Sequence, residues 1–135
     1  MTTIQNAAFA AVLNEAIQAG RIAGEECVPQ PVVFYRAGTD PADGERVDDG
    51  LCGFAWVNIA GNTAFARWLK KHTAEREAED GHNYEYGVHK GYPKGLDLWC
   101  RGFNQSHERK RAWAQAVAAR LREAGIKAYP GDRLD

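Results

Sequence analysis

Two residue types in the sequence could bind a metal or act as a nucleophile. They are four histidines and three cysteines: His72, His82, His89, His107, Cys27, Cys52 and Cys100. Zinc sites need closely spaced pairs such as Cys-x2-Cys, His-x3–5-His or His-Glu-x-x-His, and the sequence contains none of these patterns. His82 and His89 lie in a glycine-rich segment typical of a solvated loop. We therefore predict no metal site.

Nucleophilic catalysis would require a cysteine beside a histidine and an orienting polar group. Cys52 and Cys100 fall on the apolar faces of predicted strands, where a thiol packs as a small hydrophobic side chain. The sequence also lacks a Gly-x-Ser-x-Gly elbow, a glycine-rich phosphate loop and the histidine spacing of an HNH nuclease. We predict no catalytic residues, no cofactor and no enzymatic activity.

Nucleic-acid binding is the chemical alternative. Between residues 70 and 101, basic side chains alternate with aromatic ones: Lys70, Lys71, Lys90, Lys94 and Arg101, with Tyr84, Tyr86, Tyr92 and Trp99. A basic, tyrosine-rich loop over residues 81–95 could stack bases and bind phosphates. The net charge of −1 argues against a dedicated nucleic-acid-binding protein, because such proteins carry a strong basic excess.

The elements that must position these side chains begin with a helix over residues 3–19. Apolar residues recur at helical spacing from Phe9 to Ile17, Thr2 is a candidate N-cap, and Gly20 and Gly24 predict its end. A strand over 32–36 and an acidic loop over 37–50 follow. The strand at 51–59 is apolar on both faces, so it must be covered on both, by helices or by a neighbouring subunit.

The middle of the chain is an insertion around residues 70–95. Phe65, Trp68 and Leu69 predict a short helix beginning near Ala64, and the polar continuation to residue 80 predicts exposure to solvent. Four glycines and three tyrosines make residues 81–95 typical of a long surface loop or an extended hairpin.

The last forty residues predict a strand at 96–101, a helix at 106–124 and a strand at 126–129 that ends before Pro130 and Gly131. The helix carries a core stripe, a stripe of small residues and a solvated face. The core stripe is Trp113, Val117, Leu121 and Ala124; the small stripe is Ala112, Ala116 and Ala119; the solvated face is Arg111, Gln115 and Arg122. A small-residue stripe permits close approach of a helix or a second subunit.

The whole sequence predicts one α+β domain over residues 1–135. Its sheet has about four strands, mixed or antiparallel, and the N-terminal and C-terminal helices flank it. No apolar run approaches the roughly 20 residues that span a bilayer, and the N-terminus lacks the pattern of a secretory signal. Three widely spaced cysteines favour reduced thiols in a cytoplasm.

Charge is unevenly distributed along the chain. Residues 1–66 hold three basic and eight acidic side chains, whereas residues 67–135 hold fourteen basic and ten acidic ones. Such a chain can associate head to tail, with the acidic part of one copy against the basic part of the next. Alternatively, the charges mix in the folded protein and cancel.

In length and element order the chain resembles the tail terminator (tail-to-head joining) proteins of long-tailed phages. Four segments resemble small structural proteins of actinobacterial phages: Gly-Phe-Ala-Trp-Val at 53–57, Phe-Ala-Arg-Trp-Leu-Lys-Lys at 65–71, Glu-Arg-Lys-x-Ala-x-Ala-Gln-Ala at 108–116, and Gly-Ile-Lys-Ala-Tyr with a final Arg-Leu-Asp at 125–135. The insertion at 70–95 is longer and richer in glycine and tyrosine than the family pattern, so other neck or head–tail connector proteins remain alternatives.

The resemblance implies a structural protein of the virion that assembles in the host cytoplasm. It would form a homo-hexameric ring on the tail tube protein, stop tube growth and dock the head–tail connector, with DNA passing through the channel without sequence-specific binding. We expect three surfaces to contact other subunits or the tail. They are the last helix, at Arg111, Ala112, Ala116, Ala119 and Arg122, the 81–95 loop, at Lys90, Tyr92 and Lys94, and the 37–50 loop.

Overall fold

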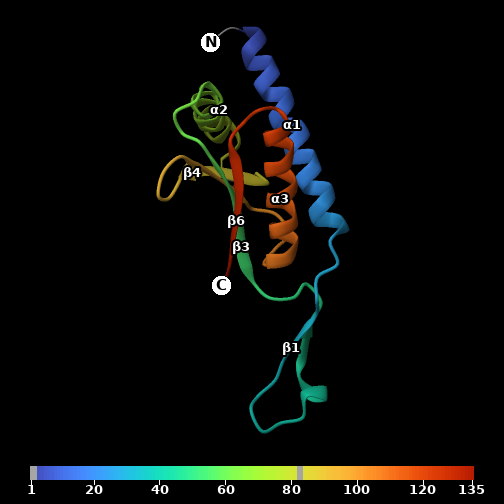
Figure 1. The fold of residues 1–135 in the computed structure, drawn as a ribbon. Helices are drawn as coiled ribbons and strands as arrows, with labels where there is room; N and C mark the ends of the chain where they lie inside the picture. Colours follow the sequence, from blue (N-terminus) through green and yellow to red (C-terminus); the bar gives the residue numbers. More distant parts are fainter. Residues whose placement is uncertain (1–2, 82–83) are drawn as a thin grey trace.

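The computed structural model describes residues 3–81 and 84–135, and it has an α+β fold (Figure 1). The N-cap predicted at Thr2 and the side chain of His82 lie outside the described residues. The helices are α1 (Thr3–Glu26), the one-turn η1 (Pro41–Asp43), α2 (Ala64–Asp80) and α3 (His107–Glu123). The strands are β1 (Val32–Phe34), β2 (Glu45–Val47), β3 (Gly53–Ile59), β4 (Tyr86–Lys90), β5 (Leu96–Cys100) and β6 (Ala128–Leu134).

Four strands form one antiparallel sheet in the order β4-β5-β3-β6, which confirms the predicted size and antiparallel type of the sheet. The strand predicted at 32–36 is not part of it, and β4 takes the fourth place. Strand β3 lies between β5 and β6, so Val57 pairs with Leu98 on one side and with Pro130 on the other. Along β3, Ala55, Val57 and Ile59 are buried, while the side chains between them are half-buried. The remaining strands, β1 and β2, form a separate hairpin.

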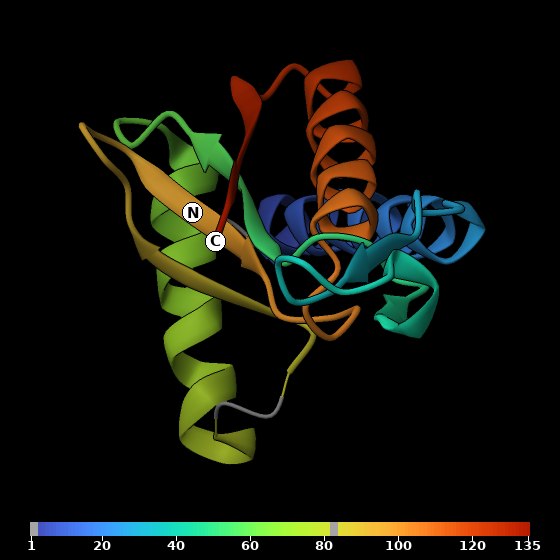
Figure 2. The ribbon, with the colours of Figure 1, turned by 90° about the horizontal axis from the view of Figure 1, so that it is seen from below.

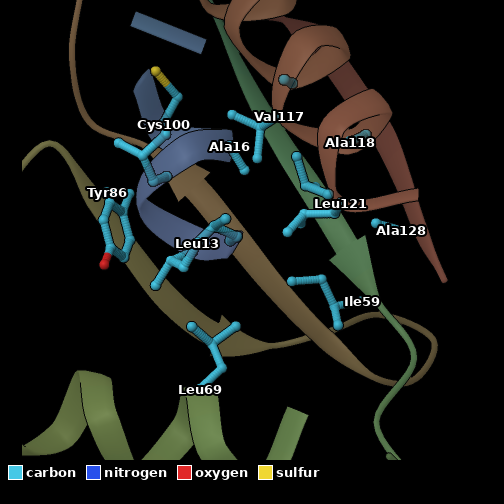
Figure 3. Packing of buried hydrophobic residues seen from close by; sticks show 14 of the residues in the cluster. Leu13, Ala16, Ile59, Leu69, Tyr86, Cys100, Val117, Ala118, Leu121 and Ala128 are labelled. Atoms are coloured by element: carbon cyan, nitrogen blue, oxygen red, sulfur yellow. The ribbon is translucent and has the colours of Figure 1, made fainter. Parts of the chain in front are cut away.

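All three α-helices contribute to one core on the inner face of the sheet. Figure 3 shows Leu13 and Ala16 of α1, Leu69 of α2 and Leu121 of α3 in the same buried cluster as Ile59 of β3. Helix α2 lies along the β4 side of the sheet and α3 along the β6 side (Figure 2). The expected packing of the first and last helices is therefore confirmed, and α2 adds a third helix to this layer.

Helix α1 does not end between Gly20 and Gly24, as predicted, but continues to Glu26. A Cβ atom on Gly20 would lie 2.5 Å from Val117 Cγ2, and one on Gly24 would lie 2.2 Å from the Phe103 ring. The two glycines are there because α3 and Phe103 approach α1 closely, and this packing outweighs the low helix propensity of glycine.

Replacing Gly20 by alanine is expected to lower the free energy of unfolding by about 1–3 kcal/mol, because the methyl group overpacks the contact with α3. Helix propensity alone would raise stability by about 1 kcal/mol, so the two effects have opposite signs. Urea denaturation followed by circular dichroism measures the difference. Gly102→Ala is the control, since no atom lies within 4 Å of a Cβ built there. A Gly20→Ala protein at least as stable as the unaltered one would contradict this packing.

Other details also differ from the predictions. Strand β6 continues through Pro130 and Gly131 instead of ending before them. A proline fits here because β6 is an edge strand, where no neighbouring strand needs its backbone N–H. Helix α2 is continuous over the polar residues to Asp80. The predicted core residue Ala124 is exposed, since it caps α3 just before Gly125 adopts a positive φ of 84°.

The acidic segment at 37–50, predicted as a loop, includes β2, which pairs with β1. Of the two predictions for residues 81–95, a loop or an extended hairpin, the hairpin is confirmed, because residues 86–95 comprise β4 and the turn to β5. Cys52, predicted to be buried, is exposed because it precedes β3 at the edge of the body; the prediction for Cys100 is confirmed.

Candidate functional site

The β1–β2 hairpin projects from the rest of the protein; we call residues 30–50 the arm. Figure 1 shows it extending from the body on the side away from α2, and in Figure 2 it points toward the viewer. Within the described residues, β1 and β2 pair with each other and with no strand of the four-stranded sheet. Val33, Phe34 and Tyr35 are 43%, 54% and 54% exposed, so the arm presents apolar side chains to solvent.

The N-terminus of α3 fixes the arm where it leaves the body. Ser106, which is buried and caps α3, donates a hydrogen bond from its Oγ to the carbonyl of Asp49 at 2.8 Å. Glu108 accepts a hydrogen bond from the backbone N–H of Gln30, on the other chain segment of the arm base. Arg109 donates to the carbonyl of Gly24 at 2.8 Å and lies 3.4 Å from the Asp49 carboxylate. The base is held firmly, whereas the tip is free of the body.

The arm is acidic. It contains five carboxylates and two arginines. Asp40 caps η1 and Asp48 pairs with Arg46 at 2.7 Å, which leaves Asp43 and Glu45 exposed near the tip. Apolar and negatively charged side chains are therefore presented together on one projecting hairpin.

The far end of the sheet is basic. Two hollows, of about 570 and 500 Å³, lie on either side of the contact between Gly61 and Gly95. Five exposed cations line them, and we call these the basic end: Arg67, Lys70, Lys90, Lys94 and Lys127. Among the described residues, no carboxylate lines either hollow and none of the five cations forms an ion pair. Half-buried Val88 and Leu96 and exposed Tyr129 add apolar surface.

The turn that carries Lys94 is fixed by hydrogen bonds. The Asn58 side chain donates to the Lys94 carbonyl at 2.9 Å and to the buried Asp97 carboxylate at 2.8 Å. The backbone N–H of Gly91 donates to the Gly95 carbonyl at 2.8 Å and closes the turn. The basic end is therefore a positioned surface.

The acidic arm and the basic end lie at opposite ends of β3. The arm leads into Gly53, the first residue of β3, and Ile59 at the other end leads into Gly61 between the hollows. Seven residues of strand separate them by roughly 20 Å. The charge asymmetry of the sequence is thus kept in the folded protein.

The outer face of the sheet carries aromatic rings that contact one another. Trp56 and Trp99 have centroids 4.9 Å apart, and Phe54 lies 6.1 Å from Trp99. The Trp56 ring lies against Gly131 of β6, where a Cβ would come within 2.5 Å of it. Arg133 lies 5.1 Å from the centroid of the Phe54 ring. These rings cover one another, so the second apolar face of β3 is only partly exposed.

The structure divides the interface residues predicted from the sequence into two places. Ala112, Ala116 and Ala119 are half-buried on α3, next to Trp113, which contacts α1 at Gly20. The other two predicted residues of α3 contact β6 of the same chain: Arg111 lies 3.6 Å from Asp132, and Arg122 donates to the Ala128 carbonyl at 2.8 Å.

Lys90, Tyr92 and Lys94 lie together at the exposed tip of the β4–β5 hairpin, and Tyr92 is 91% exposed. Two of them belong to the basic end. The sequence predicts the 37–50 part of the arm as a contact surface, but it does not predict the pairing of this segment with β1 into a projecting hairpin.

Residue types with catalytic or metal-binding potential are dispersed. Within residues 3–81 and 84–135, no three histidine, cysteine or acidic side chains are grouped to hold a metal ion. Burial raises the pKa of the Cys100 thiol to about 11, which disfavours the nucleophilic thiolate. Burial, followed by the nearby Arg76, lowers the pKa of His72, which stacks on Trp68. No helix in the described part of the chain is long and apolar enough to cross a membrane.

Comparison of the chain with models of known protein families, with curated proteins and with solved structures gave no match in any of the three.

Proposed function

We propose that this chain is a structural protein of a phage virion that acts by assembling with other protein subunits at the head–tail junction, as a tail terminator. The exposed apolar arm carries the proposal. A hairpin that presents Phe34 and Tyr35 to solvent serves recognition, because exposed apolar surface of this kind marks a protein–protein contact. The separation of the acidic arm from the basic end suits a head-to-tail interface, which closes into a ring by rotation.

The proposed partners are further copies of the chain in a hexameric ring, the tail tube protein below it and the head–tail connector above it. Another neck protein would use the same surfaces. A nucleic-acid-binding module is the second candidate, and the exposed Lys90, Tyr92 and Lys94 at the hairpin tip favour it.

Light scattering over a wide concentration range tests the proposal. A closed hexamer would have a mass of about 90 kDa, six times that of the 14.9 kDa chain, with a plateau as concentration rises. Negative-stain electron microscopy should then show rings with a central channel. A mass that stays at that of the monomer, or that keeps growing with concentration, would contradict a closed ring.

A further inference from the structure

The arm is a two-stranded hairpin with three paired positions, Val32 with Val47, Val33 with Arg46 and Phe34 with Glu45. An isolated hairpin of this kind is only marginally stable in water, because neither face is covered. The hydrogen bonds from α3 hold its base but not its tip. Its apolar side chains therefore favour a binding surface that covers them.

The surface that covers the arm must accept both apolar and negatively charged groups. The basic end has both properties, since its two hollows combine five cations with the apolar groups of Val88, Leu96 and Tyr129. Charge complementarity of this type steers association and selects the partner. Asp43 and Glu45 on the arm would face Lys90 and Lys94 across the contact.

The arm of one chain cannot reach the basic end of the same chain. It is held at the start of β3 and points away from the body, whereas the basic end lies beyond the end of β3 (Figure 1). From residue 30 to residue 38 the arm extends about 25 Å at most, which is sufficient to reach a neighbouring molecule. The complementary surfaces can therefore meet only between copies.

We infer that the arm of each copy docks on the basic end of the next, with Phe34 and Tyr35 against the hollows beside Gly61 and Gly95. The contact is heterologous: each copy binds one neighbour through its arm and another neighbour through its basic end. This inference rests on the proposed function in requiring that copies of the chain associate, and it names the surfaces that do so.

Two variants that reverse charge test the contact. Asp43→Lys with Glu45→Lys makes the arm basic, and Lys90→Glu with Lys94→Glu makes the basic end acidic. In sedimentation velocity at low salt, each variant alone should associate about tenfold or more weakly than the unaltered chain, because like charges then meet. A 1:1 mixture of the two should recover association to within about threefold, because the arm of each variant then matches the basic end of the other.

The matched control for the arm reversal is Glu75→Lys with Glu79→Lys, which changes the net charge by the same amount and sign at exposed carboxylates of α2. It should leave association unchanged. Circular dichroism confirms that all variants are folded, so that loss of association is not loss of structure.

The outcomes separate this inference from the proposed function. If a 90 kDa ring persists in both reversed variants, the docking inference is wrong but the proposed ring is supported. If the unaltered chain forms open polymers that the reversals abolish and the mixture restores, the docking is right and the ring is wrong. A chain that stays monomeric overturns both. If Lys90→Glu with Lys94→Glu instead abolishes binding of a single-stranded oligo-dT and leaves association intact, the basic end binds nucleic acid and the inference is overturned.

Discussion

Replacing Trp113 by alanine is expected to lower the free energy of unfolding by about 3–5 kcal/mol. The Trp113 side chain is only 1% exposed and is the largest fully buried side chain among the residues that the structure describes. It lies on α3 against Gly20 of α1, so its removal leaves a cavity between the two helices whose contact organises the core. Urea denaturation followed by circular dichroism measures the loss.

A loss of this size approaches the whole stability of an ordinary domain, about 5–15 kcal/mol, so Trp113→Phe is needed as a smaller step. Phenylalanine keeps one ring, and the expected loss is intermediate. The exposed Gln115, two residues away on the same helix, provides the control Gln115→Ala, which should change stability by less than about 0.5 kcal/mol. A Trp113→Ala protein that loses less than about 1 kcal/mol would show that the two helices repack without a cavity.

The elements predicted well from the sequence are those in which one periodicity dominates. Ala55, Val57 and Ile59 alternate along β3 with half-buried residues, and Trp113, Val117 and Leu121 recur along α3 at helical spacing. In both cases burial against a single neighbouring layer imposes the pattern. The fold class follows from such segments, whereas the place of β4 in the sheet does not.

The elements predicted poorly depend on contacts that are distant in sequence. In the sequence, Gly20 indicates the end of a helix. In the structure, Val117, almost one hundred residues later in the chain, occupies the space that a side chain at Gly20 would need. Pro130 and Gly131 read as a turn, yet the edge position of β6 and the ring of Trp56 make both residues compatible with a strand. Neither of these tertiary contacts can be inferred from the local propensities of the residues.

The candidate site was also predictable only in part, because some of its residues are close in sequence and others are brought together only by the fold. Lys90 and Lys94 are identified by their type and neighbourhood, and both belong to the basic end. Arg67 and Lys127 belong to it as well, but only the sheet brings them to the hollows that Lys90 and Lys94 line. The arm required the pairing of β1 with β2, and a three-residue strand within an acidic segment gives little signal of pairing.

Stability is also expected to fall steeply at alkaline pH. Burial raises the pKa of the Cys100 thiol from 9.0 to about 11 and that of the Tyr86 hydroxyl from 10.0 to about 12. Below pH 9 both groups are protonated in the folded and unfolded states, so they add no pH dependence. Above pH 9 the unfolded chain loses these protons first, and ionisation therefore favours unfolding until the folded groups also titrate, at about pH 11 and 12.

A shift of two pKa units corresponds to about 2–3 kcal/mol for each group. The charged groups that face them reduce the effect without reversing it: Lys110 lowers the pKa of Cys100 and Arg76 lowers that of Tyr86, while Glu85 raises both. Urea denaturation at pH values from 8 to 11 should show the decline, and Cys100→Ala should flatten it by about 2 kcal/mol despite a lower starting stability. Tyr86→Phe should flatten the upper part of the range, whereas Tyr92→Phe, at an exposed tyrosine, should leave the profile unchanged. Equal slopes in Cys100→Ala and the unaltered protein would mean that water reaches the thiol, and that the core between β5 and α3 is less tightly closed than the burial of Cys100 indicates.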